Sequence, residues 1–421
     1  MRLLICTPTA SLQGGVERIV ESLALQLPSR GIEVRFALAR GARFHDPDRF
    51  RAAYPAIQGF DVDGRSGTSY GRRRALRRVI ERFDPDVVLI ARMFDAYPVC
   101  SELKLRGHRL RLTLTMQAYE SDYFVDLQRY AAFVDACVTS GNFMSTAVRR
   151  FTDLPADRVH SIPGGVAAPR RSRVPRSGPL RLGYVGRLEQ VQKRAYDLIP
   201  FVEELERRGI DYTLDIAGDG SALPDLRAKL PRARFYGWIA TDALYERIYP
   251  ELDVLVHFAE WEGLPIAPRE AMAHGVVPVS SRYIGDIDFV DGENALTFPV
   301  GGIAAAVDAI ERLHRDRALL AKLSRAARAS QTGVRSEQGA IDAWAEVFRD
   351  AVSRESRVGD ALPFVGRDPG LLTRLQVPEP VAEIVRALRK RKHGDPGSEW
   401  PHWSGIANEE LADAVMRFSR P

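Results

Sequence analysis

Short apolar runs alternate with helix-like segments along the first part of the chain. Runs short enough for buried strands occupy residues 2–6, 32–38, 86–90, 112–116 and 136–138. After the first run, apolar residues recur at helical spacing, at Val16, Ile19, Val20, Leu23 and Leu27. Strands that alternate with helices predict a parallel sheet covered by helices.

The alternation stops at SIPGGVAAPRRSRVPRSGP, residues 161–179. Proline, glycine and arginine dominate this stretch and no apolar period survives in it, which predicts a linker. We place the linker proper at residues 169–179, after a first domain over residues 1–168.

Beyond the linker the alternation resumes. Strands are predicted at residues 180–185, 212–217, 234–236, 254–258 and 277–280, with helices near 194–208, 241–248 and 266–274. Three more helical patterns follow and end near residue 353. We therefore expect an α/β protein with a second Rossmann-like domain at 180–335, a closing helix at 336–354, and a basic, partly helical extension at 355–421.

The length and composition agree with this division. A chain of 421 residues suits two domains, and 45% hydrophobic with 27% charged residues is the composition of a globular protein. No apolar run approaches the roughly 18 residues of a membrane-spanning helix. The opening MRLLICTPTA becomes polar too soon for a signal peptide, so we expect a cytoplasmic protein.

The net charge limits the classes of binding partner, and the cysteine positions indicate whether disulfides form. A net charge of +5 suits a phosphorylated substrate or an anionic membrane, whereas the basic clusters at 72–78 and 386–392 lack the interleaved aromatics of a nucleic-acid platform. We therefore expect no nucleic-acid partner. Cys6, Cys100 and Cys137 lie far apart in apolar contexts, which predicts buried free thiols.

Two parallel α/β domains imply a cleft, with ligands outside the carboxyl ends of the strands. Gly14 and Gly15 follow such a strand and open a helix, which suits a phosphate or is simply a tight turn. The stretch AGDGSAL at 217–223 has Leu223 where a dinucleotide fingerprint needs its third glycine, so we expect no dinucleotide cofactor.

Two cations follow another strand. Arg187 comes directly after Gly186 in LGYVG, and Lys193 comes six residues later. A guanidinium fork and a point charge at a sheet edge suit a diphosphate. The alternative is that both are solvated surface charges.

Two glutamates follow the strand at 254–258. In EGLPIAPREAMAHG, Glu262 precedes a turn and Glu270 is expected in the first turn of the next helix. Carboxylates accept hydrogen bonds from vicinal diols, so a ribose or a hexose is one natural ligand. A hydrolase acid–base pair and, for Glu270, compensation of the helix dipole are the other interpretations.

In combination these pieces resemble the retaining glycosyltransferases of GT-B architecture, in particular glycosyltransferase family 4. The matching segments, in chain order, are GGVERIV, SIPGGV, GYVGRLEQVQKR, DIAGDG, FYGWI and EGLPIAPREAMAHGVVPV, spread over about residues 1–350. The resemblance implies two Rossmann-like domains that face a central cleft.

The resemblance also implies roles for the matching positions. Glu270 would hold the ribose of a nucleotide sugar, and Glu262 the hydroxyls of its sugar. Arg187 and Lys193 would neutralise the departing diphosphate. The remaining donor-binding positions would be Gly14, Gly15, Gly186, Gly237 in the base-reading FYGWI, and Gly263, Leu264 and Pro265 beside the diphosphate.

Transfer would proceed with retention to a glycan or lipid-linked acceptor, in cell-surface polysaccharide assembly. No metal and no cofactor is expected, because Arg187 and Lys193 would supply the positive charge. A sugar phosphorylase, a nucleotide-sugar epimerase and a sugar-nucleotide-binding protein without turnover remain alternatives.

The sequence departs from the family on the acceptor side. Where many members have a histidine, the chain reads MQAYESDY, which leaves Gln117, Tyr119 and Glu120 as candidates. Arg92 and Asp95 follow the previous strand and join them; ordinary loop polarity is the alternative for each. His257 and His274, near the glutamates, are expected to be packed rather than catalytic.

Residues 355–421 lie beyond the resemblance. Val381, Ile384, Val385 and Leu388 recur at helical spacing before a cationic run, and Trp400 and Trp403 follow. Peripheral contact with the inner face of an anionic membrane is one interpretation, and a helix docked on the body is the other.

Overall fold

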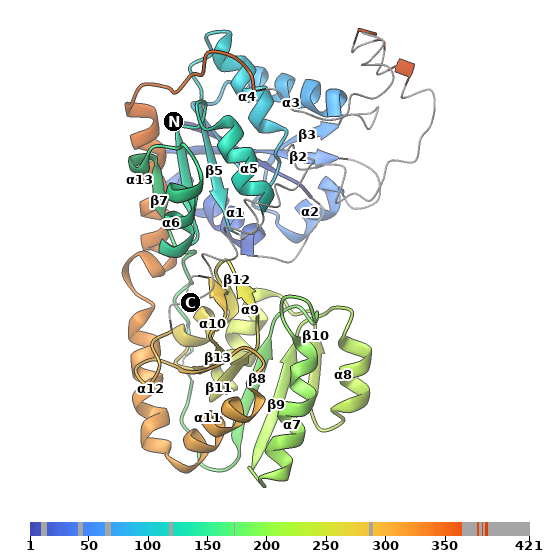
Figure 1. The fold of residues 1–421 in the computed structure, drawn as a ribbon, viewed down its shortest axis with the longest axis vertical. Helices are drawn as coiled ribbons and strands as arrows, with labels where there is room; N and C mark the ends of the chain where they lie inside the picture. The colour runs from blue at the N-terminus through green and yellow to red at the C-terminus, as the bar shows by residue number, and fades with distance from the viewer. Residues whose placement is uncertain are drawn as a thin grey trace. The chain divides into compact units, whose positions relative to one another are not determined.

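A computed structural model describes residues 1–9, 15–40, 45–63, 69–117, 121–171, 173–285 and 289–363, together with 377–378, 381 and 384–385. Within these residues the chain forms two compact units. One holds Met1–Pro163 and the described residues from Ile341 onward, and the other holds Gly164–Ala340. Figure 1 labels the helices and strands of both units.

The first unit is built on a seven-stranded sheet in which all neighbours run parallel. In spatial order the strands are β3 (Gly59–Asp63), β2 (Glu33–Arg40), β1 (Arg2–Thr7), β4 (Val87–Ile90), β5 (Arg111–Met116), β6 (Ala136–Thr139) and β7 (Val159–Ser161). Its helices are α1 (Gly15–Gln26), α2 (Pro47–Ala53), α3 (Ser69–Phe83), α4 (Ala96–Leu105), α5 (Ser121–Tyr130), α6 (Asn142–Phe151) and most of α13 (Glu337–Ser353).

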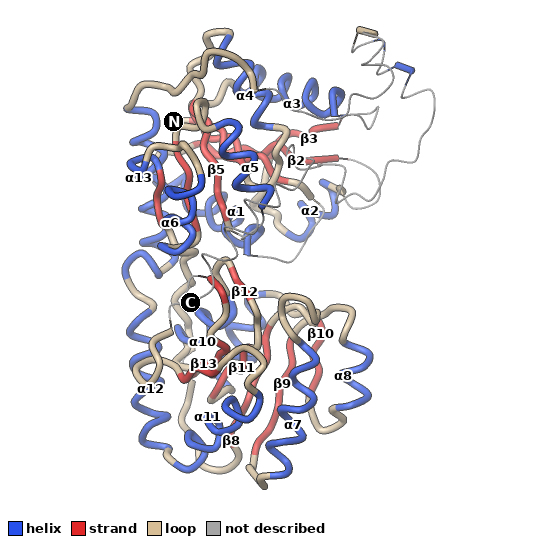
Figure 2. The backbone as a smooth tube through the Cα atoms, viewed as in Figure 1, coloured by secondary structure: helices blue, strands red, loops and turns tan. Residues whose placement is uncertain are grey.

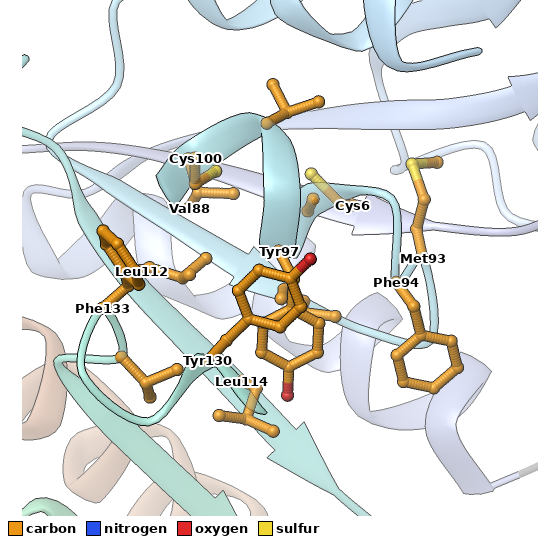
Figure 3. Packing of buried hydrophobic residues seen from close by; sticks show 14 of the residues in the cluster. Cys6, Val88, Met93, Phe94, Tyr97, Cys100, Leu112, Leu114, Tyr130 and Phe133 are labelled. Carbon is orange, nitrogen blue, oxygen red and sulfur yellow. The ribbon is translucent and has the colours of Figure 1, made fainter. Parts of the chain in front are cut away.

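Consecutive buried residues in the central strands show that this sheet is covered on both faces. Leu3 and Ile5 of β1 are as completely buried as Leu4 and Cys6, so consecutive side chains are all removed from water. The core on one face includes stacked rings of Tyr97 and Tyr130, with centroids 5.1 Å apart (Figure 3). The three cysteines are free and buried, as predicted.

The second unit is built on a six-stranded parallel sheet. In spatial order the strands are β10 (Arg234–Gly237), β9 (Tyr212–Ala217), β8 (Leu180–Val185), β11 (Val254–His257), β13 (Val277–Ser281) and β15 (Leu296–Phe298). A separate parallel pair joins β12 (Trp261–Glu262) to β14 (Ile284–Gly285). The helices are α7 (Leu198–Arg207), α8 (Leu223–Lys229), α9 (Thr241–Ala243), α10 (Ile266–Ala273), α11 (Ile303–Arg315) and α12 (Arg317–Ser330).

Alternation along the strands divides the second core in two. Val254 and Val256 of β11 pack in the cluster that holds α7, α8 and α11, whereas Leu255 packs with Leu244 and Ala271 on the opposite face. Helices therefore flank the strands in this unit as in the first (Figure 2). The predicted α/β fold with two parallel sheets is confirmed.

Most predicted strands appear within a residue or two of their expected bounds, and the differences occur in short elements. The short strands β3, β7, β12, β14 and β15 were not predicted. The helix expected near 241–248 is three residues of α9 followed by a π-helical turn at Leu244–Ile248.

The arginine-rich stretch at 161–179 contains fixed residues. Arg173 donates its backbone N–H to the carbonyl of His274, at 2.8 Å, and its guanidinium pairs with buried Asp253. Gly165 lies so close to Ser336 that an added Cβ would meet the Ser336 carbonyl oxygen at 2.5 Å. Parts of this stretch are therefore packed on the second unit.

The segment after α13 is held to the first unit by a buried ion pair. Lys104 and Asp135 pair with side chains that are both 0% exposed. The Lys104 ammonium also donates to the Arg357 carbonyl at 2.9 Å, and Asp135 accepts the Arg357 N–H at 2.8 Å. A buried pair of this kind is stable only with such additional hydrogen bonds, and here the C-terminal segment supplies them.

Candidate functional site

Three glycines bring the loops after β8, β9 and β10 into contact. Gly218 has φ +151°, and an added Cβ would lie 1.8 Å from the Gly186 carbonyl oxygen. Its N–H donates to the Gly237 carbonyl at 2.8 Å. A Cβ added to Gly220 would likewise lie 2.4 Å from the Leu188 carbonyl oxygen. The glycines of AGDG therefore serve close backbone packing at the carboxyl edge of the sheet.

Arg187 leaves this edge directly after Gly186. Its side chain is 46% exposed and its Nη1 pairs with Glu189 at 2.7 Å. The other terminal nitrogen, Nη2, donates to the amide oxygen of Gln192 at 2.5 Å. The guanidinium is thus oriented from two sides while part of it stays open to solvent.

Glu262 is the centre of the polar cluster. It lies on β12 with a nearly buried side chain, and its Oε1 accepts from the Lys193 ammonium. The same oxygen lies 3.2 Å from Nε2 of His257, and Oε2 accepts from the Gln192 amide at 3.4 Å. One carboxylate therefore gathers donors from the loop after β8 and from the end of β11.

The electrostatics keep Glu262 ionised. Burial raises the pKa of this carboxyl, but Lys193 and His257 together outweigh burial and bring the pKa down to about 2. Glu262 is an anion throughout the physiological range, neutralised by an adjacent ammonium.

His257 is neutral and its tautomer follows from its partners. Burial lowers the pKa of His257 despite the adjacent carboxylate. Because an ionised carboxylate only accepts, the hydrogen must be on Nε2, which faces Glu262. Nδ1 then accepts from the Ser280 hydroxyl at 3.0 Å. His257 is packed, as predicted, and it also helps to hold Glu262.

Glu270 lies in a different environment. It is the fifth residue of α10, in the second turn, and is 1% exposed, so it is not the first-turn charge that the sequence predicts. Its carboxylate accepts from the Tyr249 hydroxyl at 2.8 Å and from the Tyr245 hydroxyl at 3.4 Å. His274 donates from Nδ1 to the Glu270 backbone carbonyl at 2.7 Å. Two phenol hydroxyls donate to this carboxylate, whereas an ammonium donates to Glu262.

The residues between the two glutamates form a turn into α10. Gly263 and Pro265 are buried and Leu264 is half-buried. Arg269, fully buried beside Glu270, donates to the Gly164 carbonyl and so connects α10 to the start of the linker stretch. This contact gives the IPGGV segment a structural role.

The structure therefore brings Arg187, Lys193 and Glu262 into one network and places Glu270 on the following helix. Gly186 and Gly237 lie at the same sheet edge, where Gly237 has φ +67°. Two members of the network, Gln192 and His257, are absent from the sequence-based site. The sequence signal that could have identified Gln192 is its position directly before Lys193.

The candidates of the first unit are more dispersed. Asp95 is 1% exposed and accepts from buried Arg72 at 3.2 Å, an ion pair inside the unit. Gln117 donates to the Thr115 hydroxyl at 2.6 Å. Arg92 follows β4 with a left-handed φ of +72°, and its Nη1 lies 3.8 Å from Glu17.

Of the remaining first-unit candidates, the structure describes Gly15. Gly15 begins α1 and is exposed. Gly14, Tyr119 and Glu120 lie outside the described residues, as do Leu388, Trp400 and Trp403. Val381 and Ile384 of the C-terminal extension are helical and exposed.

Neither a metal-binding cluster nor a membrane-spanning helix occurs among the described residues. Among the residues that the structure describes, no three His, Cys, Asp or Glu side chains are grouped so as to hold a metal ion. No described helix combines the length and the apolar character needed to cross a bilayer.

Two family models match the chain on either side of the linker. The model described as Glycosyltransferase Family 4 matches residues 13–170, and the model described as Glycosyl transferases group 1 matches residues 179–316. The chain belongs to this glycosyltransferase family. Its two parallel-sheet units are the GT-B fold of that family.

Curated relatives match parts of this chain. A glycogen synthase of Mycobacterium tuberculosis is 28% identical over 242 residues, which cover 55% of this chain and 58% of the relative. The chain thus spans little more than half the length of that relative. A GDP-mannose-dependent alpha-mannosyltransferase of Corynebacterium glutamicum is 33% identical over 132 residues, covering 31% of this chain and 30% of the relative.

A solved structure extends the likeness over most of the fold. The Anabaena protein HepE, crystallised with UDP and glucose, superposes with a TM-score of 0.66. The match covers 83% of this chain and 100% of HepE at 16% identity. At that identity the likeness supports the GT-B fold alone.

Proposed function

We propose that the protein is a retaining glycosyltransferase that moves a hexose from a nucleotide-diphosphate donor to a glycan or lipid-linked acceptor. The observation that carries the proposal is the network of Arg187, Lys193 and Glu262 at the carboxyl edge of the second sheet. Family membership, the GDP-mannose named for one relative and the UDP and glucose bound to HepE support a nucleotide-sugar donor.

Charge development explains why this network suits the reaction. When the bond between the anomeric carbon and the phosphate oxygen breaks, its electron pair leaves with the diphosphate and the sugar ring becomes oxocarbenium-like. Cations that are already fixed stabilise the leaving group without reorganisation. Arg187 and Lys193 provide them, and the departing phosphate takes the proton of the acceptor hydroxyl as that hydroxyl attacks from the same face.

The two glutamates divide the donor between them. Glu262, held ionised, accepts from hydroxyls of the sugar, and Glu270 accepts from the ribose in place of its present tyrosine donors. Loss of one charged hydrogen-bond partner at such a site costs about 1.5–3 kcal/mol, or roughly a tenfold to hundredfold loss of binding.

We also propose that catalysis needs no metal, because an ammonium and a guanidinium occupy the place of the divalent cation found at other diphosphate sites. The setting that we propose is cell-surface polysaccharide assembly by a cytoplasmic enzyme, with peripheral membrane contact through the C-terminal extension. Transfer to a lipid-linked acceptor over a soluble glycan would support this setting.

Nucleotide release from a panel of UDP-, GDP-, dTDP- and ADP-sugars tests the proposal. Wild type should act on one donor, equally with and without EDTA, and Glu270→Ala should lose that activity. Glu203→Ala, an exposed carboxylate on α7, is the matched control and should leave release unchanged.

The product separates the remaining alternatives. A glycoside of retained configuration supports transfer, whereas free sugar phosphate or an epimerised donor indicates a phosphorylase or an epimerase. Binding of a nucleotide sugar with no product indicates a protein without turnover. Silence across the panel, with no thermal shift by any nucleotide, would rule out this donor site.

A further inference from the structure

We propose that Gln192 is a positioning residue that couples Arg187 to Glu262 in the donor site. The inference rests on the proposed function of that site. Gln192 lies in the turn between β8 and α7, directly before Lys193, and its side chain is half-buried.

The amide of Gln192 uses both of its ends. Its oxygen accepts from Arg187 at 2.5 Å, and its nitrogen donates to Glu262 Oε2 at 3.4 Å and to the Trp261 carbonyl at 3.1 Å. Its backbone is fixed as well, since the Gln192 carbonyl accepts the N–H of Glu260 at 2.9 Å. The side chain therefore bridges the loop after β8 and strand β12.

A primary amide satisfies these neighbours because it carries both an acceptor and donors. A guanidinium has donors and no acceptor, and an ionised carboxylate has acceptors and no donor. A bridge between them must accept on one side and donate on the other. A carboxylate at position 192 would oppose Glu262, a cation would oppose Arg187, and an apolar group would contact neither partner.

The bridge orients Arg187 without neutralising it. Glu189, the other partner of the guanidinium, is an anion and competes with any diphosphate for the same charge. The neutral amide of Gln192 instead holds the guanidinium toward β12, where Lys193 already pairs with Glu262. Both cations are thereby presented from one network, as a departing diphosphate requires.

The turn itself is built tightly. Arg194, two residues after Gln192, has a left-handed φ of +49° and pairs with Asp197 and Glu260. The charged groups around the amide are thus Arg187, Glu189, Lys193, Arg194, Glu260 and Glu262, with neutral His257 behind Glu262. Of these, Arg187 and Glu262 contact the amide of Gln192 directly.

Three substitutions test the role on the donor that wild type uses. Gln192→Leu replaces the amide by an apolar group and removes its hydrogen bonds to Arg187, Glu262 and Trp261, and we expect kcat to fall at least tenfold while KM for the donor changes less than threefold. Gln192→Asn keeps the chemistry but is one methylene too short, and we expect a similar loss. Val191→Ala, at an exposed neighbouring position, is the control and should match wild type.

Gln192→Glu gives a readout that a structural role would not move. While the introduced carboxyl is protonated it can both accept and donate, so activity relative to wild type should be highest at low pH. It should fall at least fivefold as that carboxyl ionises beside Glu262. Circular dichroism and thermal midpoints would establish that each variant is folded.

A Gln192→Leu or Gln192→Asn variant within twofold of wild-type kcat, or a Gln192→Glu pH profile that parallels wild type, would overturn the positioning role. These outcomes differ from failure of the proposed function, in which wild type itself releases nucleotide from no donor and the inference falls with it.

Discussion

The carboxyl edges of the two parallel sheets carry similar residue types but use them differently. In the second unit Gln192, Lys193 and His257 converge on one carboxylate, Glu262, and Gln192 connects Arg187 to it. Among the described candidates of the first unit, Asp95 pairs with Arg72, Gln117 with Thr115 and Arg92 with Glu17.

The comparison shows what a donor-binding motif must supply and a packed core need not. A diphosphate sugar has fixed charge and geometry, so a donor site requires cations and acceptors at set positions on neighbouring loops. Buried Asp95 and Arg72, in contrast, form an ion pair inside the unit, where opposite charges neutralise each other within a folded core. Residue type alone did not separate these two situations.

The largest effect should follow loss of Lys193. Lys193→Met removes the ammonium that neutralises the leaving group and leaves Glu262 ionised in a buried position. We expect kcat on the preferred donor to fall roughly 10²- to 10³-fold, the range for loss of one preorganised charge-stabilising donor. Lys229→Met, at an exposed position on α8, should have no effect. A loss below fivefold for Lys193→Met would mean that the network at the edge of the second sheet does not stabilise the leaving group.

Asp95 should govern stability rather than catalysis. Asp95→Ala leaves the guanidinium of Arg72 buried without this carboxylate, and we expect the free energy of unfolding of the first unit to fall by about 3–4 kcal/mol. Asp48→Ala, which breaks the exposed pair with Arg40, should leave the thermal midpoint unchanged. If Asp95→Ala keeps its stability and instead raises KM for the acceptor, Asp95 belongs to an acceptor site.

The pH dependence of stability should show the charge of Glu262. Its pKa is about 2 in the folded protein against an ordinary 4.5, so its contribution is complete above pH 4.5 and is lost as pH falls toward 2. This contribution, about 3 kcal/mol above pH 4.5, should be absent from Glu262→Gln. Hydrogen exchange in β12 and α10 between pH 5 and 2.5 would measure it. Equal slopes in wild type and variant would contradict the low pKa.

The smallest effect concerns the backbone of Arg92. Its left-handed conformation costs roughly 1 kcal/mol for a non-glycine residue, so Arg92→Gly should raise the free energy of unfolding by up to that amount. If the strain serves acceptor binding, KM for the acceptor should rise at the same time. Asp84→Gly, also left-handed at φ +49° but at the end of α3, is the matched control for stability alone. A destabilised Arg92→Gly would mean that its contact with Glu17 outweighs the strain.

Long apolar segments were predictable because their burial does not depend on details elsewhere in the chain. Strand β8 at Leu180–Val185 and strand β9 at Tyr212–Ala217 have the predicted bounds, since short runs rich in apolar residues between helical patterns are typical of parallel sheets. The two-residue β12 was not predictable, because a parallel pair with β14 depends on a partner more than 20 residues away.

The sequence by itself determined the fold class, the family and the positions of Arg187, Lys193, Glu262 and Glu270, because periodicity and short motifs are local properties. Only the tertiary structure decided which of these residues meet. Gln192 and Glu262 are 70 positions apart, and their contact exists because β8 and β11 are neighbours in the sheet. Likewise the ionisation of Glu262 and the pairing of Asp95 with Arg72 follow from burial and from charges on other elements, which no local pattern contains.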